Sequence, residues 1–264
     1  MSGVRELLRY RYLFAQLVRR ELRQKYQGSA LGVLWYVINP LVLMGAYYLM
    51  FGVIFKTVSH HDYPLFLMVG LVVWIFFSQS LLSAAPSLLD QGALIRKVRF
   101  PRETIPASVV TVQLITFVVV FALVTVITVV IVGTVSPELL LLVPLVVALF
   151  MFALGLGLIV SILHAYFRDV APILSAALLP WFFISPIFFT VGDLGVVRHK
   201  EWARIVLTWV NPIAPFITAV RKVVYDGVVP PAGTLLYVGV AALVIPVVGA
   251  VLFRRLQGEL AVVL

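Results

Sequence analysis

The sequence predicts an all-α integral membrane protein with six transmembrane helices, and three observations lead to that prediction. The 264 residues are 62% hydrophobic and only 12% charged, whereas soluble domains are about 45–50% apolar and about 25% charged. Several uncharged runs reach about 20 residues, the length at which a helix crosses the roughly 30 Å hydrocarbon layer. The basic residues gather beside these runs, where they orient membrane helices. We therefore expect residues 1–264 to form one transmembrane domain.

Charge and cysteine content argue against several other classes of protein. A net charge of +9 would fit nucleic-acid binding if the basic residues lined a soluble face with interleaved aromatic side chains. They flank apolar runs instead, so no nucleic-acid partner is expected. The sequence contains no cysteine, which leaves no disulfide, thiol nucleophile or cysteine-ligated zinc. His60, His61 and Asp62 are adjacent in one short loop without a second cluster, so no metal site is expected.

Residues 1–27 are expected to form an amphipathic helix at the membrane interface. Its apolar and aromatic side chains recur every four residues, at Tyr10, Phe14, Val18, Leu22 and Tyr26. The basic side chains fall largely on the other side, toward anionic lipid or a partner. The alternative is that this segment only orients the protein in the membrane.

The six spans are expected at residues 31–55, 64–89, 107–132, 138–163, 171–191 and 234–253. Residues 90–106, between the second and third spans, carry four basic residues and two prolines. Pro101 and Pro106 predict a short helix followed by a turn there, because proline breaks a helix interior. In the fourth span, Gly155 and Gly157 indicate close helix packing.

Residues 205–220 are apolar but short for a crossing, and Asn211-Pro212 and Pro215 split them. Broken backbone survives at membrane depth only inside protein or beside a wet cavity, so we expect an external re-entrant hairpin between spans five and six. With the amino terminus inside, fourteen Lys and Arg residues are cytoplasmic and six are external, Arg221 and Lys222 among them. Both termini are therefore expected in the cytoplasm, and a seventh crossing would weaken the asymmetry.

Four stretches of the sequence resemble the membrane permease subunit of type-2 ABC exporters, in particular those that move lipid-linked polysaccharides such as O-antigen, teichoic acid and capsule. They are YQGSALGVLWYVINPL at 26–41, LIRKVRFPRETIP at 94–106, HAYFRDV at 164–170, and SPIFFT with NPIAPFITAVRKVVYDG at 185–190 and 211–227. The similarity covers essentially the whole chain. It implies a homodimer around a central channel in the bacterial cytoplasmic membrane.

The energy for transport is expected to come from a separate protein. The sequence has no G-x-x-x-x-G-K-[ST] motif, so it has no nucleotide site of that kind. None of the six expected spans carries an Asp, Glu, His, Lys or Arg residue in its interior, whereas ion-coupled carriers usually need such groups at depth. Two copies of a partner ATPase, which binds ATP and Mg²⁺, explain both absences, and this chain itself is expected to have no cofactor and no enzymatic activity.

The loop at residues 90–106 is the expected docking segment for that ATPase. Its apolar side chains suit an apolar cleft and its basic side chains suit acidic residues at the rim. The residues concerned are Leu94, Ile95, Arg96, Lys97, Arg99, Phe100 and Arg102. The alternative is a solvated loop whose charge only sets orientation; the family resemblance favours docking.

Two further sets of residues are candidates for substrate contact. Sugar rings stack on aromatic side chains, and the candidate channel aromatics are Trp35, Tyr36, Tyr47, Trp181, Phe182 and Phe183. Any one of them is as well explained by an interfacial or lipid-facing position. Basic groups bind phosphate strongly, and those expected to attract a lipid pyrophosphate at the cytoplasmic entry are Arg19, Arg20, Arg23 and Lys25.

The first hypothesis is thus the transmembrane subunit of an ATP-driven exporter of a lipid-linked polysaccharide. A drug or lipid exporter is the alternative within the same class, since the sequence does not show a continuous channel. A membrane enzyme acting on polyprenyl phosphate is the third hypothesis. It would need acids, histidines or a metal converging at one membrane face, and the external acids Asp62, Asp193, Glu201 and Asp226 are scattered in the sequence.

Overall fold

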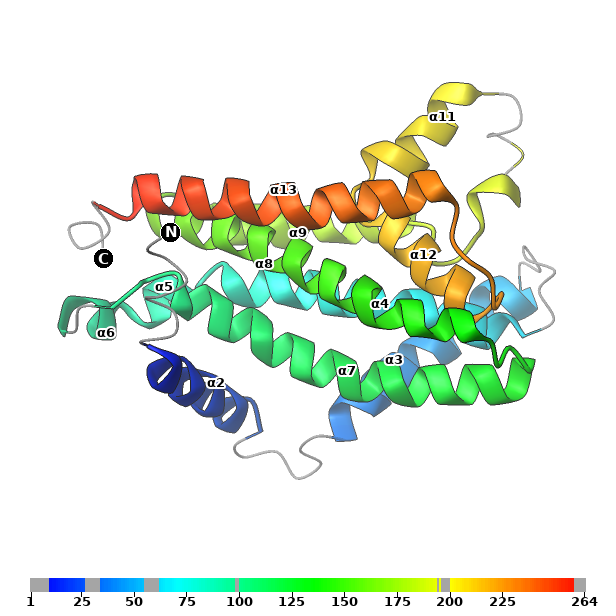
Figure 1. Cartoon of the computed structure of the whole chain (residues 1–264), viewed down its shortest axis with the longest axis horizontal. Helices are drawn as coiled ribbons and strands as arrows, with labels where there is room; N and C mark the ends of the chain where they lie inside the picture. The colour runs from blue at the N-terminus through cyan, green and yellow to red at the C-terminus, as the bar shows by residue number, and fades with distance from the viewer. Residues whose placement is uncertain are drawn as a thin grey trace.

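The computed structural model is all-helical over the residues that it describes, which are 10–26, 34–54, 62–97, 100–193, 195 and 200–258. The long helices run roughly side by side, with α2, α5 and α6 at one end of the bundle and α12 toward the other (Figure 1). We call these the α6 end and the α12 end.

Within the described residues, four helices are long and apolar enough to cross a membrane. They are α4 (Tyr63–Ala84), α7 (Thr104–Val132), α8 (Leu142–Tyr166) with the preceding 3-10 turn η3 (Pro137–Leu141), and α13 (Ala232–Leu256). A fifth is present only if the bent pair near residue 211 is counted as one span. The prediction of an all-helical, multi-span protein is confirmed, whereas the count of six is not.

The two remaining expected spans are shorter helices. The first consists of α3 (Trp35–Tyr47) and the π-helical turn η2 (Tyr48–Ile54), and its apolar part is Ile38–Ile54. The other is α9 (Val170–Ile184), which ends before Ser185 and Pro186. Proline disfavours a helical conformation at the preceding residue, which explains why α9 ends seven residues earlier than the expected span.

The core of the bundle is built around α4, which packs against α3, α7, α8, α9 and α12. Phe77 of α4 is completely buried and stacks on Phe152 of α8, with ring centroids 5.9 Å apart. Phe76 packs on Phe117 of α7 at 4.8 Å. Because α4 is enclosed on nearly all sides, its apolar side chains contact protein rather than lipid.

Helices α8 and α13 lie unusually close because glycines face each other. A Cβ on Gly155 would lie 2.5 Å from the backbone nitrogen of Pro246. A Cβ on Gly249 would collide with the carbonyl oxygen of Gly155. Small residues allow such close approach of membrane helices, so Gly155 has the packing role that the sequence indicated.

The bent pair consists of α11 (Glu201–Ile205) with the π-helical turn η5 (Val206–Val210), followed by α12 (Ala214–Val224). The two halves meet at 82° across a short break. Asn211 stabilises this break: its Nδ2 donates to Ser185 Oγ at 3.0 Å and its Oδ1 accepts from Trp181 Nε1 at 2.8 Å. The prolines and Asn211 thus end one helix and start another, as expected from the sequence.

Arg221 of α12, which is expected on the external side of the membrane, is a buried cation. Its Nη1 and Nη2 donate to the carbonyl oxygens of Pro186 and Ile187 at 2.8 and 2.9 Å. Its Cζ lies 3.7 Å from the centroid of the Phe66 ring. The guanidinium therefore ties α12 to α4 and to the segment that follows α9.

At the α6 end, the short helices α5 (Ser87–Asp90) and α6 (Gly92–Lys97) connect α4 to α7. A second apolar cluster holds this end together and includes Leu88, Ile105, Ile162 and Phe253. The expected short helix followed by a turn is present, since α6 ends at Lys97 and residues 102–103 form a turn before α7 begins at Thr104. Pro106 itself does not break a helix, because it lies inside α7. Pro106 lies in the first turn, where a backbone N–H has no helical partner to lose.

Candidate functional site

An open groove of about 260 Å³ lies between α3, α4 and α9 and is the best candidate for substrate contact. Tyr47, Trp74 and Phe182 give it an aromatic wall, while Asn39, Ser78 and Gln79 add polar groups. The ring centroid of Phe182 is 5.4 Å from that of Tyr47 and 5.6 Å from that of Trp74. The remaining lining is aliphatic: Leu43, Leu71, Ile75, Leu82, Leu178 and Leu179.

Helical periodicity explains why these side chains share one surface. On α3 the lining residues Asn39, Leu43 and Tyr47 are four residues apart, and α9 contributes Leu178 and Phe182 at the same spacing. Residues at i and i+4 lie on one face of a helix. On α4 the lining residues follow steps of three and four from Leu71 to Leu82, so one stripe of each helix faces the groove.

The groove contains two of the six expected channel aromatics, Tyr47 and Phe182. Trp181 lies in the interior, where its ring is 5.3 Å from Phe77 and its Nε1 is bonded to Asn211. Phe183 is exposed and stacks on Phe188 at 5.9 Å. Trp35 is exposed at the start of α3, and the side chain of Tyr36 lies outside the described part of the chain.

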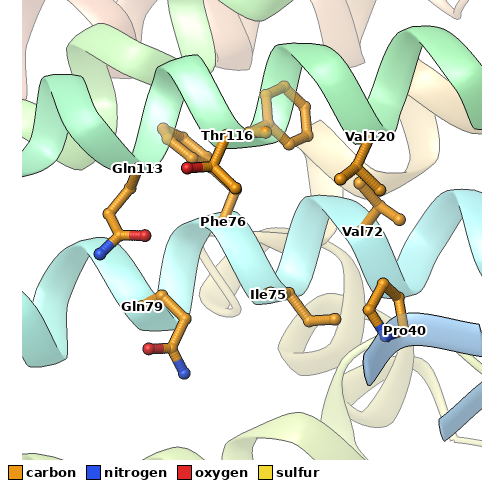
Figure 2. A pocket seen from close by; sticks show the side chains of 9 residues that line it. Pro40, Val72, Ile75, Phe76, Gln79, Gln113, Thr116 and Val120 are labelled. Atoms are coloured by element: carbon orange, nitrogen blue, oxygen red, sulfur yellow. The ribbon is translucent and has the colours of Figure 1, made fainter. Parts of the chain in front are cut away.

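A small pocket of about 40 Å³ between α3, α4 and α7 adjoins the groove, because Ile75 and Gln79 line both. Figure 2 shows Gln79 of α4 and Gln113 of α7 at one end of this pocket and Pro40 of α3 at the other. Its other walls are apolar apart from Thr116. The two amides continue the polar side of the groove toward α7.

A third cavity, of about 310 Å³, lies between α2 (Arg11–Tyr26), α4 and α7, and Gln113 also lines it. Lys25 Nζ donates to Gln113 Oε1 at 2.6 Å, and Gln113 Nε2 donates to Ser83 Oγ at 2.8 Å. Burial lowers the pKa of Lys25 to about 8. Polar groups therefore extend from the interface helix to the aromatic groove, through Lys25, Gln113 and Gln79.

The four expected entry cations differ in their surroundings. Arg20 Nη1 donates to Gln91 Oε1 at 3.1 Å, and Gln91 Nε2 donates to Glu21 Oε1 at 3.2 Å. Burial raises the pKa of Glu21, and the charge of Arg20 opposes that rise. Arg19, Arg20 and Arg23 are exposed and Lys25 is half-buried; of the four, Arg20 and Lys25 hold α2 against the bundle through their bonds to Gln91 and Gln113.

The expected docking segment is partly used inside the chain. Ile95 is 5% exposed and belongs to the apolar cluster at the α6 end, and Phe100 packs against that cluster. Arg102 donates to the carbonyl oxygen of Gln257. Leu94 is half-buried, Arg96 and Lys97 are exposed, and Arg99 lies outside the described residues. Ile95 is therefore not available to fill a partner's cleft.

Sequence reasoning missed Trp74, Gln79 and Gln113. Gln79 and Gln113 had a signal, because each is an amide inside an apolar span, whereas Trp74 had none, because the same span also carries Phe66, Phe76 and Phe77. Among the described residues, no three His, Asp or Glu side chains gather as a metal site.

Comparison with known proteins identifies the family. Residues 12–225 match the ABC-2 type transporter membrane family. The chain belongs to this family.

Its relatives align along almost their full length. The chain is 33% identical over 259 residues to the O-antigen export system permease protein RfbA of Myxococcus xanthus, covering 98% of this chain and 97% of that protein. It is 29% identical to RfbA of Klebsiella pneumoniae, covering 96% of each. The polysialic acid transport protein KpsM of Escherichia coli is 28% identical over 90% of this chain and 91% of its own length. As an ABC-2 permease, the chain is a multi-pass membrane protein.

Proposed function

We propose that this chain is the transmembrane subunit of an ATP-driven exporter for a lipid-linked polysaccharide, and that the aromatic groove is one wall of its channel. The observation that carries the proposal is the lining of the groove, in which the half-buried ring of Tyr47, backed by the buried rings of Trp74 and Phe182, stands beside the exposed amides of Asn39 and Gln79. Aromatic faces stack on sugar rings, and the polar groups form hydrogen bonds with the sugar hydroxyls. Relatives named for O-antigen export and polysialic acid transport support this substrate class.

A homodimer completes the channel in this proposal. The groove is open, and most of α9 beside it is not covered by the chain, since only Leu178 and Phe182 of this helix are buried. A second copy packed on the exposed sides of α3 and α9 closes the groove. It also lets these short helices cross as the first and fifth of six spans, with the bent pair as a re-entrant hairpin on the external side.

Substrate enters from the cytoplasmic side, which is the α6 end with both termini. Arg19 and Arg23 are exposed on α2 and attract the pyrophosphate of the lipid carrier, because guanidinium groups bind phosphate in a bidentate manner. The glycan then enters the groove beside the exposed amide of Gln79.

Two copies of a partner ATPase, which bind ATP and Mg²⁺, supply the energy. They dock against α6, where Arg96 and Lys97 are exposed at its carboxyl-terminal end. Acidic residues at the rim of a partner's cleft match this charge. Leu94 is the apolar member of the docking surface.

Replacing Tyr47 with leucine tests the role of the groove. Tyr47→Leu keeps an apolar side chain but removes a ring from the lining, so surface glycan in export-dependent cells should fall by about ten-fold while the amount of membrane-inserted protein stays constant. Tyr48→Leu is the matched control, since Tyr48 is the next residue, is exposed, and lies outside the groove. Equal export by the two variants would overturn the assignment of the groove.

A further inference from the structure

A fourth cavity, of about 280 Å³ and with a polar lining, lies at the α12 end. The start of α4, the segment after α9 and the bent pair form its walls. It is separate from the groove and shares no lining residue with it. Three threonines, Thr190, Thr208 and Thr218, contribute hydroxyl groups to its wall. Its charged lining residues are Arg221, Lys222 and Asp226.

Arg221 is the unusual member of this wall, because it is a cation that is only 6% exposed. Each of its two terminal nitrogens donates one hydrogen bond, Nη1 to the carbonyl oxygen of Pro186 and Nη2 to that of Ile187. Its Nε is buried and has no hydrogen-bond partner among the described residues. Carbonyl groups satisfy donors but bring no negative charge, and a buried cation without a counter-charge is costly.

The neighbouring charges supply only part of that counter-charge. Asp226 acts electrostatically on Arg221, but its Oδ2 also lies 2.7 Å from Lys222 Nζ, so one acid is shared by two cations. The guanidinium of Arg221 therefore leaves a net positive charge in the wall of the cavity. Hydroxyl donors together with a buried guanidinium and an ammonium group are the chemistry that binds oxyanions.

We propose that this cavity is a binding site for a phosphate group at the α12 end of the protein. The phosphate oxygens lie against Arg221 and Lys222 and accept hydrogen bonds from the threonine hydroxyls. A lipid headgroup and a water-soluble phosphate both offer this group. The proposal rests on the cavity and its charges alone, and it stands whether or not the chain exports a polysaccharide.

Binding of inorganic pyrophosphate to the full-length protein in an uncharged detergent tests the site, with phosphorus NMR as the readout. We expect saturable binding. Lys222→Gln and Thr218→Val should each weaken it about ten-fold, the effect of losing one hydrogen bond to a charged group. Neither variant removes the bonds from Arg221 to the two carbonyl oxygens, so both are expected to fold.

Arg204→Gln is the matched control, because Arg204 is an exposed cation paired with Glu201 in the same bent pair but outside the cavity. It should bind pyrophosphate like the unaltered protein. Absence of saturable binding to the unaltered protein would overturn the proposal, and so would equal weakening by Arg204→Gln and Lys222→Gln.

Competition with short-chain phosphatidylglycerol identifies the source of the phosphate. If phosphatidylglycerol displaces pyrophosphate from the unaltered protein, and competes about ten-fold more weakly in Lys222→Gln, the site binds a lipid headgroup. Saturable pyrophosphate binding that the lipid does not displace assigns it to a water-soluble phosphate. In both cases the site itself is established.

Discussion

Helices α4 and α9 are both apolar, yet the chain encloses one and leaves the other open. In α4 most side chains are buried by its neighbours α3, α7, α8, α9 and α12. In α9 only Leu178 and Phe182 are buried. The difference shows that hydrophobic composition identifies a membrane helix but does not say whether protein, lipid or a second copy covers it. The groove lies where these two kinds of helix meet.

The largest expected effect is a difference between the two helices in how far loss of a ring lowers the free energy of unfolding. Phe77→Ala in α4 removes a completely buried ring and should cost about 3 kcal/mol of unfolding free energy, since the site cannot collapse around the cavity. Phe183→Ala in α9 should cost less than about 1 kcal/mol, because that ring is 48% exposed. Thermal unfolding in detergent measures both, and equal losses would remove the contrast between the helices.

The next effect tests whether a second copy covers α9. Ala176 is exposed on this helix, and Ala176→Trp should weaken the dimer by about 2 kcal/mol through overpacking while leaving the protomer folded. Ala122→Trp on the exposed face of α7 is the control, where we expect lipid to make room for the larger side chain. Size-exclusion chromatography with light scattering reports the oligomeric state, and an unchanged dimer in Ala176→Trp would place the interface elsewhere.

The smallest effect concerns Lys25, where the interface helix meets the enclosed part of the bundle. The folded pKa of Lys25 is about 8, below the unfolded value of about 10.4, so the unfolded chain binds more protons between these values. Stability should therefore rise with pH from about 8 to about 10, by about 1 kcal/mol once solvent screening is included.

Lys25→Met should lack that rise. Melting temperatures of both proteins across this pH range measure the difference. Parallel curves would mean that Lys25 keeps an ordinary pKa in the folded protein.

The sequence was sufficient for the elements whose signals are local. Uncharged length predicted the long helices, and Asn211 with its neighbouring prolines predicted the break between η5 and α12. Gly155 predicted a close helix contact, and the partner is α13. The runs and the break are visible in continuous stretches of sequence, whereas Gly155 indicated that a close contact exists but not that α13 makes it.

The features that the sequence did not predict depend on contacts between residues far apart in the chain. Arg221 resembles an exposed charge beside Lys222 and Asp226, but helical spacing puts it on the buried face with Ile217 and Val224. Of the adjacent pair Trp181 and Phe182, only Phe182 faces the groove, since neighbouring residues on a helix point about 100° apart. Ile95 has the position of a docking residue in the sequence. The side chains that bury it, such as Ile162 and Phe253 of the apolar cluster at the α6 end, come from distant parts of the chain.

Site-specific photocrosslinking in cells that export glycan tests the central claim, that the groove is the channel wall. The crosslinker is a benzophenone-bearing residue in place of Gln79, which lines the groove, or in place of Ile115, which is exposed on α7. We predict a glycan adduct at position 79 that depends on ATP hydrolysis, and none at position 115. An adduct at position 115 but not at position 79 would contradict the account.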